Sequence, residues 1–81
     1  MTLWEFINFW DHVQYTALQN HVEASFQEVP FVDAISFHVR NPQTKKVTTF
    51  YISKLGLENL GDDAKRILTE KLLDMIREVK E

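Results

Sequence analysis

The feature that most constrains the fold is a pair of short β-rich segments joined by a turn. In residues 35–40 apolar side chains alternate with polar ones, which is the pattern of a strand with one buried face. A second β-rich run spans residues 47–52. Between the two runs, Asn41 suits the first position of a turn and Pro42 fixes φ at the second. The sequence therefore predicts an antiparallel β-hairpin.

The register of this hairpin follows from the pairing that gathers its apolar side chains on one face. With a four-residue loop, the cross-strand pairs on that face are Phe37 with Phe50 and Ile35 with Ile52. The opposite face then shows mostly polar side chains: Ser36, His38, Arg40, Val47, Thr49 and Tyr51. A slip by one residue would exchange the two faces of the second strand and weaken the core, so we expect this register.

Helices are expected before the hairpin. Thr2 and Glu5 have the spacing of a capping box, and periodic apolar residues extend a helix over about residues 3–18. The apolar stripe then rotates, and Asn20 offers a second cap, so a shorter helix is expected over residues 21–28. One bent helix through both segments is the alternative.

A further helix is expected after the hairpin. Residues 57–60 suit one helical turn, and residues 62–79 carry a continuous apolar stripe with acidic residues at its start. The chain of 81 residues is therefore expected to be a single small globular domain over residues 1–81. Its predicted fold class is α+β, in the order α-α-β-β-α, with an antiparallel β-hairpin packed against N-terminal and C-terminal helices.

Charge is divided unevenly along the chain. Residues 1–33 contain five carboxylates and no Lys or Arg, whereas residues 34–54 contain four Lys or Arg and no carboxylate. This division predicts an acidic, aromatic surface and a separate basic one. The chain has no cysteine, only two glycines, and three histidines without metal-ligand spacing. We therefore expect no metal, no cofactor and no enzymatic activity.

The first helix supplies the candidate protein interface. Trp4 and Tyr15 lie outside its main apolar stripe, roughly in line with Leu18, and Phe9 lies at the edge of that stripe. Surface Trp and Tyr residues are over-represented at binding hot spots. These four residues are expected to contact a protein partner or a second copy of the chain, with a homodimer favoured because a two-stranded sheet is marginal alone. The alternative is that other elements cover both sides of this helix.

The hairpin supplies a candidate basic contact made of His38, Arg40, Lys45 and Lys46. Each Lys or Arg that contacts a phosphate adds salt-dependent affinity for a nucleic acid. The same charges would also suit an acidic protein, and basic turns are common as solvated ends that discourage strand pairing. Nucleic-acid binding is therefore the less favoured function of this segment.

The opening segment, residues 2–11, resembles the start of many very small proteins from phages and mobile elements of Firmicutes. That resemblance implies a protein that binds and inhibits a host protein. The order of helix, hairpin and helix is also similar to double-stranded RNA-binding domains, but those carry Lys where this chain has Asp62 and Asp63. We reject this second resemblance because the carboxylates would repel phosphate.

These observations predict a non-enzymatic protein–protein interaction module, of the type of a phage inhibitor or accessory factor. The alternative is a small nucleic-acid-binding protein that uses the basic hairpin 38–46. No membrane partner is expected, because no apolar run approaches the ~20 residues that a membrane span needs. The N-terminus lacks the basic and apolar regions of a signal peptide, so the expected location is cytoplasmic.

Overall fold

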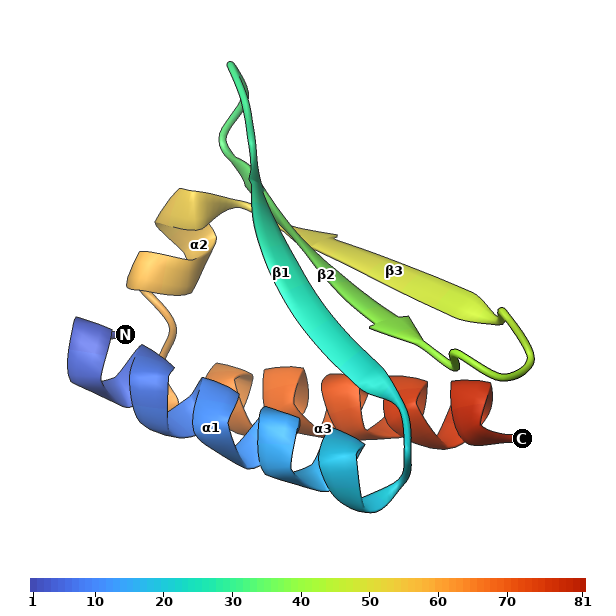
Figure 1. Cartoon of the computed structure of the whole chain (residues 1–81). Coiled ribbons are helices and arrows are strands. Elements are labelled where there is room, and N and C mark those ends of the chain that lie inside the picture. Colours follow the sequence, from blue (N-terminus) through green and yellow to red (C-terminus); the bar gives the residue numbers. More distant parts are fainter.

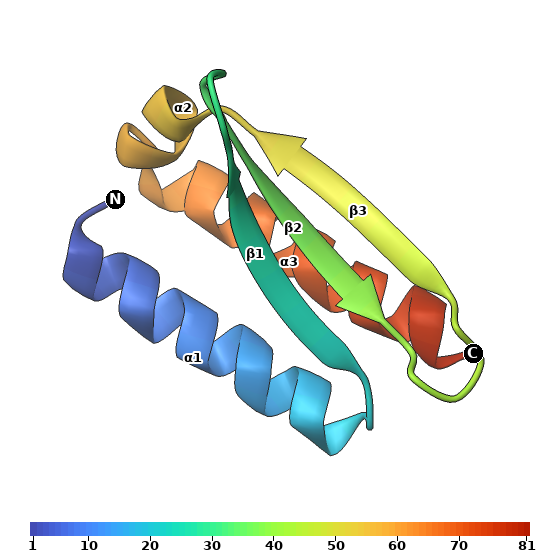
Figure 2. The ribbon, with the colours of Figure 1, turned by 45° about the horizontal axis from the view of Figure 1, so that its top comes forward.

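The computed structural model describes residues 1–81 as two layers, a three-stranded antiparallel sheet and a pair of helices beneath one of its faces (Figure 1). The elements in chain order are α1 (Leu3–Gln19), β1 (Glu23–Val29), β2 (Ala34–Arg40), β3 (Val47–Ile52), α2 (Lys54–Glu58) and α3 (Asp62–Lys80). Helices α1 and α3 lie side by side, α1 below β1 and α3 below β2 and β3 (Figure 2). The other face of the sheet carries no helix.

The predicted α+β class and the hairpin between helices are confirmed, and so is its register. Phe37 pairs with Phe50, and Ile35 with Ile52, across antiparallel strands β2 and β3. The loop closes with a hydrogen bond of 2.9 Å from the backbone N–H of Asn41 to the carbonyl oxygen of Lys46. The apolar pairing therefore sufficed to fix which face of the hairpin is buried.

The helix predicted over residues 21–28 is wrong, because this segment is strand β1. Helix α1 ends in a Schellman motif: His21 adopts a left-handed φ of 58°, and its N–H donates to the carbonyl of Leu18 at 3.2 Å. The N–H of Val22 donates to the carbonyl of Ala17 at 3.0 Å, and both side chains are buried. This motif reverses the chain, so Asn20 closes the first helix instead of opening a second.

The other helices start where local capping places them. In α1 the Thr2–Glu5 capping box forms in both directions, as its sequence predicts. The short helical turn expected at residues 57–60 forms three residues earlier as α2, because the hydroxyl of Ser53 accepts from the N–H of Gly56 at 2.7 Å. Helix α3 begins at the predicted residue and ends one residue beyond the predicted boundary.

The core lies between the sheet and the two long helices. Phe26, Phe37 and Phe50 form a row across the three strands on the inner face. The ring of Phe37 is fully buried and has its centroid 5.8 Å from that of Trp10, which projects from α1. Helix α3 closes the core with Leu68, Leu72, Met75, Ile76 and Val79. No helix of the chain has both the length and the apolar character needed to cross a membrane.

Candidate protein-interaction surface

Three of the four residues predicted as an interface remain exposed on α1. The exposed fractions are 75% for Trp4, 62% for Tyr15 and 73% for Leu18. Phe9 is 7% exposed and belongs to the core, with its ring centroid 6.0 Å from that of Phe6. The placement of Phe9 at an interface is therefore corrected: at the edge of the apolar stripe, its ring turns toward α3 and is covered there.

Two further apolar residues of α1, Leu3 and Ile7, are also exposed. At 3.6 residues per turn, five positions share an arc about 80° wide on the side of the helix opposite the core. We call this arc the outer face of α1: Trp4, Ile7, Asp11, Tyr15 and Leu18. Sequence reasoning missed Ile7, which a helical projection places about 20° beyond Leu18, at the edge of the outer face.

The outer face has one charge and four large apolar side chains. Asp11 is exposed and takes part in no ion pair. Single exposed apolar residues are ordinary on protein surfaces, but a gathered set is typical of interaction sites. The opposite side of α1 already supplies the core through Phe9, Val13 and Ala17. The fold therefore accounts for one side of this helix and leaves the aromatic side without a partner.

The predicted basic contact is divided between two surfaces. His38 lies on the open face of the sheet, where its ring nitrogens are 2.8 Å from the hydroxyl of Ser36 and 3.2 Å from that of Thr49. Arg40 lies two positions further along β2, on the same face, and pairs with Glu23 of β1 at 3.4 Å. A polar network on the sheet thus occupies the two residues that were expected to extend the basic hairpin.

Within the predicted basic contact, only the two residues of the turn keep unpaired charges. Lys45 and Lys46 are exposed and form no ion pair. Lys54, at the other end of β3, binds Glu28 at 2.7 Å, and its hydrogen bond lowers the pKa of that carboxyl. The carboxylates of β1 therefore neutralise part of the positive charge that the sequence places in residues 34–54.

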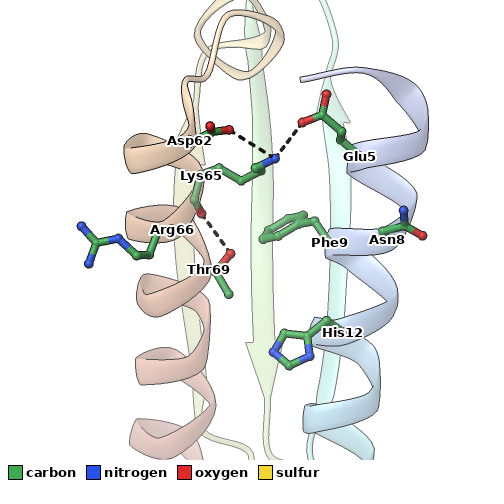
Figure 3. A pocket seen from close by; sticks show the side chains of 8 residues that line it. All are labelled: Glu5, Asn8, Phe9, His12, Asp62, Lys65, Arg66 and Thr69. Carbon is green, nitrogen blue, oxygen red and sulfur yellow. Dashed lines mark hydrogen bonds and ion pairs between the residues drawn. The ribbon is translucent and has the colours of Figure 1, made fainter.

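A polar groove separates α1 from α3 on the side away from the sheet (Figure 3). It has a volume of about 420 Å³ and is lined by Glu5, Asn8, Phe9, His12, Asp62, Lys65, Arg66 and Thr69. The ammonium of Lys65 donates to Glu5 at 2.7 Å, which lowers the pKa of Glu5 to about 2 and raises the pKa of Lys65. This ion pair connects α3 to α1, so its two charges hold the walls of the groove together.

The turn between β1 and β2 carries an aromatic residue that sequence reasoning missed. Phe31 is fully exposed and has a left-handed φ of 68°, and Val32 beside it is more than half exposed. The two residues lie at the end of a hairpin that projects beyond the helices (Figure 1). This hairpin could not be recognised while residues 21–28 were assigned to a helix.

Similar proteins of known function are a further source of evidence on what this surface does. Comparison with protein-family models, with curated proteins and with solved structures found no significant match.

Proposed function

We propose that this chain is a non-enzymatic protein–protein interaction module that binds through the outer face of α1. The observation that carries the proposal is the exposure of Trp4, Tyr15 and Leu18, each above 60%, on a helix whose opposite side is in the core. Large aromatic side chains bury about 150–250 Å² each when they are covered. A partner that covers this face would therefore remove a large apolar area from water.

The position of the outer face supports a role as a phage-type inhibitor or accessory factor that binds a host protein. The segment that resembles such proteins, residues 2–11, forms the first half of α1 and contains Trp4, Ile7 and Asp11. An exposed helix face is a common binding element, because it fits a groove through residues spaced three, four and seven positions apart. The outer face of α1 has this spacing.

Variants on one helix test the proposal. The tagged wild-type chain would first be used to identify a partner, whose affinity would then be measured by calorimetry. We expect Trp4→Ala and Leu18→Ala each to weaken binding by tenfold or more, as hot-spot truncations do. Asn8→Ala is the matched control, because Asn8 is exposed on the same helix but outside the outer face. All three variants should retain the wild-type circular dichroism spectrum.

The result that would contradict this proposal is equally definite. A partner that binds Trp4→Ala, Tyr15→Ala and Leu18→Ala as tightly as the wild type does not use the outer face. In that case the binding surface would have to lie on the sheet or on the projecting β1–β2 turn.

A second candidate function, nucleic-acid binding, is favoured by one observation. Lys45 and Lys46 are exposed neighbours without an ion pair, at a turn where an extended phosphate backbone could approach. Two unpaired cations are a small electrostatic footprint in a chain of net charge −3. Protein binding through α1 therefore remains the favoured proposal.

A further inference from the structure

The outer face of α1 is symmetric about its one charged residue. Trp4 and Leu18 lie seven positions on either side of Asp11, and Ile7 and Tyr15 lie four positions on either side. At a rise of 1.5 Å per residue, these separations are about 10 Å and 6 Å along the helix. A helix that lies antiparallel on this face would thus meet apolar side chains at both ends and a carboxylate in the middle.

This symmetry allows a second copy of the chain to fit by shape. Related by a two-fold axis through Asp11, two α1 helices would place Trp4 against Leu18 and Ile7 against Tyr15 of the other copy. The same axis would place the two Asp11 carboxylates directly opposite each other. Like charges placed face to face across an interface disfavour association.

No Lys or Arg of the chain pairs with Asp11 to relieve that repulsion. Residues 1–33 contain no Lys or Arg, and Asp11 has no ion-pair partner. The nearest carboxylate on the same helix, Glu5, already holds Lys65 at 2.7 Å, and His12 faces the α1–α3 groove (Figure 3). The charge of the face therefore opposes a second copy and suits a partner of the opposite sign.

We infer that the outer face of α1 receives a basic amphipathic helix of another protein, which carries a Lys or Arg opposite Asp11 between apolar residues. This inference rests on the function proposed above and names the chemistry of the partner. Shape supplies the apolar contacts at the two ends of the face, and the central carboxylate selects a basic helix over the chain's own α1.

The chain itself provides the probe for a test. In an equimolar mixture of the wild type and an Asp11→Lys variant, the symmetric spacing presents one basic α1 helix to one acidic one. Analytical ultracentrifugation should show a heterodimer in this mixture, while each protein alone stays monomeric at the same concentration. Asp11→Asn should self-associate at least tenfold more tightly than the wild type, because it removes the repulsion and keeps the shape.

Two controls separate this charge effect from misfolding and from contacts elsewhere. Asp11 is exposed and makes no hydrogen bond through its side chain, so both variants should melt as the wild type does. Adding Trp4→Ala to the Asp11→Lys chain should abolish the heterodimer, because it removes an apolar contact at the end of the face.

Two results would overturn the inference. One is a wild-type chain that self-associates as tightly as the Asp11→Asn variant. If Trp4→Ala then abolishes the wild-type dimer, the outer face is an interface whose occupant is a second copy of the chain. The other is a mixture of wild type and Asp11→Lys that remains monomeric, which would show that this face does not accept a basic helix. The proposed function is tested separately in either case, because it depends on whether Trp4→Ala weakens the affinity for an identified partner.

Discussion

Replacing Phe31 by glycine should stabilise the protein. Phe31 holds a left-handed φ of 68°, a conformation that costs a residue with a Cβ about 1–2 kcal/mol. Its ring is fully exposed, so its removal loses no buried area. Glycine adopts this φ without strain. Its unfolded backbone has more conformational freedom, however, which lowers the free energy of unfolding by about 0.5–1 kcal/mol and offsets part of the stabilisation. The net increase in the free energy of unfolding should be about 0.5–1 kcal/mol.

Thermal unfolding followed by circular dichroism measures this change. For a domain of this length, a gain of that size raises the melting temperature by about 2–8 °C. Phe31→Ala is the matched control, because it removes the ring but keeps the Cβ that opposes the left-handed φ. We expect its free energy of unfolding to stay within about 0.5 kcal/mol of the wild-type value.

A destabilised Phe31→Gly variant would refute the reasoning. It would mean that the ring of Phe31 makes a contact which supports the turn, or that the backbone there does not have a left-handed φ. A stabilised variant would show that the fold does not require this ring. Its place at the projecting turn would then need an explanation outside folding.

Three further predictions concern the core, the interhelical ion pair and the basic turn. Phe37→Ala should lower the free energy of unfolding by about 3–5 kcal/mol in denaturant titrations, because the ring is fully buried among other aromatics, and an unchanged midpoint would contradict the described core. The pKa of Glu5 is lowered from 4.5 to about 2 by Lys65, so its contribution to stability is present above pH 4.5 and lost as the pH falls toward 2. Glu5→Gln should therefore lower the melting temperature at pH 6. Between pH 4.5 and 2, the melting temperature of this variant should fall less than that of the wild type. Wild-type chain should bind little nucleic acid at physiological salt, and Lys45→Glu with Lys46→Glu should abolish any retention at low salt without changing the melting temperature; sub-micromolar binding at physiological salt would reverse our preference between the two proposed functions.

The hairpin of β2 and β3 could be predicted from the sequence because local and long-range signals agree there. The turn residues Asn41 and Pro42 fix the loop, and the pairing of Phe37 with Phe50 is the one that buries both rings. Asn41 also contributes something that its turn chemistry does not reveal. Its side-chain amide donates to the carbonyl of Val79 at 2.9 Å, which ties the turn to the end of α3.

Strand β1 could not be predicted in the same way because its sequence satisfies two periods. Val22, Ala24 and Phe26 alternate as in a strand, while Leu18, Val22 and Phe26 also recur at helical spacing. The decision depends on contacts far away in sequence. Phe26 packs edge-on against Phe6 and Trp10, at ring distances of 5.2 and 4.9 Å, and these contacts require the reversal at His21.

The candidate surface was predictable to the extent that the helical period alone decides exposure. Trp4, Tyr15 and Leu18 lie far from the apolar stripe and are exposed, whereas Phe9 lies at its edge. The period does not say whether an edge residue is covered, because that depends on the position of a neighbouring helix. The packing of α3 beside α1 covers Phe9, and no local signal in α1 reports it.

The two edges of the sheet are protected against pairing, and this protection bears on the binding surface proposed above. On β1, the side-chain amide of Gln14 donates to the carbonyl of Ala24 at 2.8 Å, which satisfies an acceptor on that strand. On β3, Lys45 and Lys46 lie immediately before the strand and Lys54 shortly after it, and such charges discourage strand addition. The outer face of α1 has no comparable device, since its only charge, Asp11, leaves the apolar residues of the face exposed. The proposed interaction through α1 therefore requires no rearrangement of the fold, whereas strand pairing at β1 would displace the Gln14 amide and pairing at β3 would bring a strand against flanking lysines.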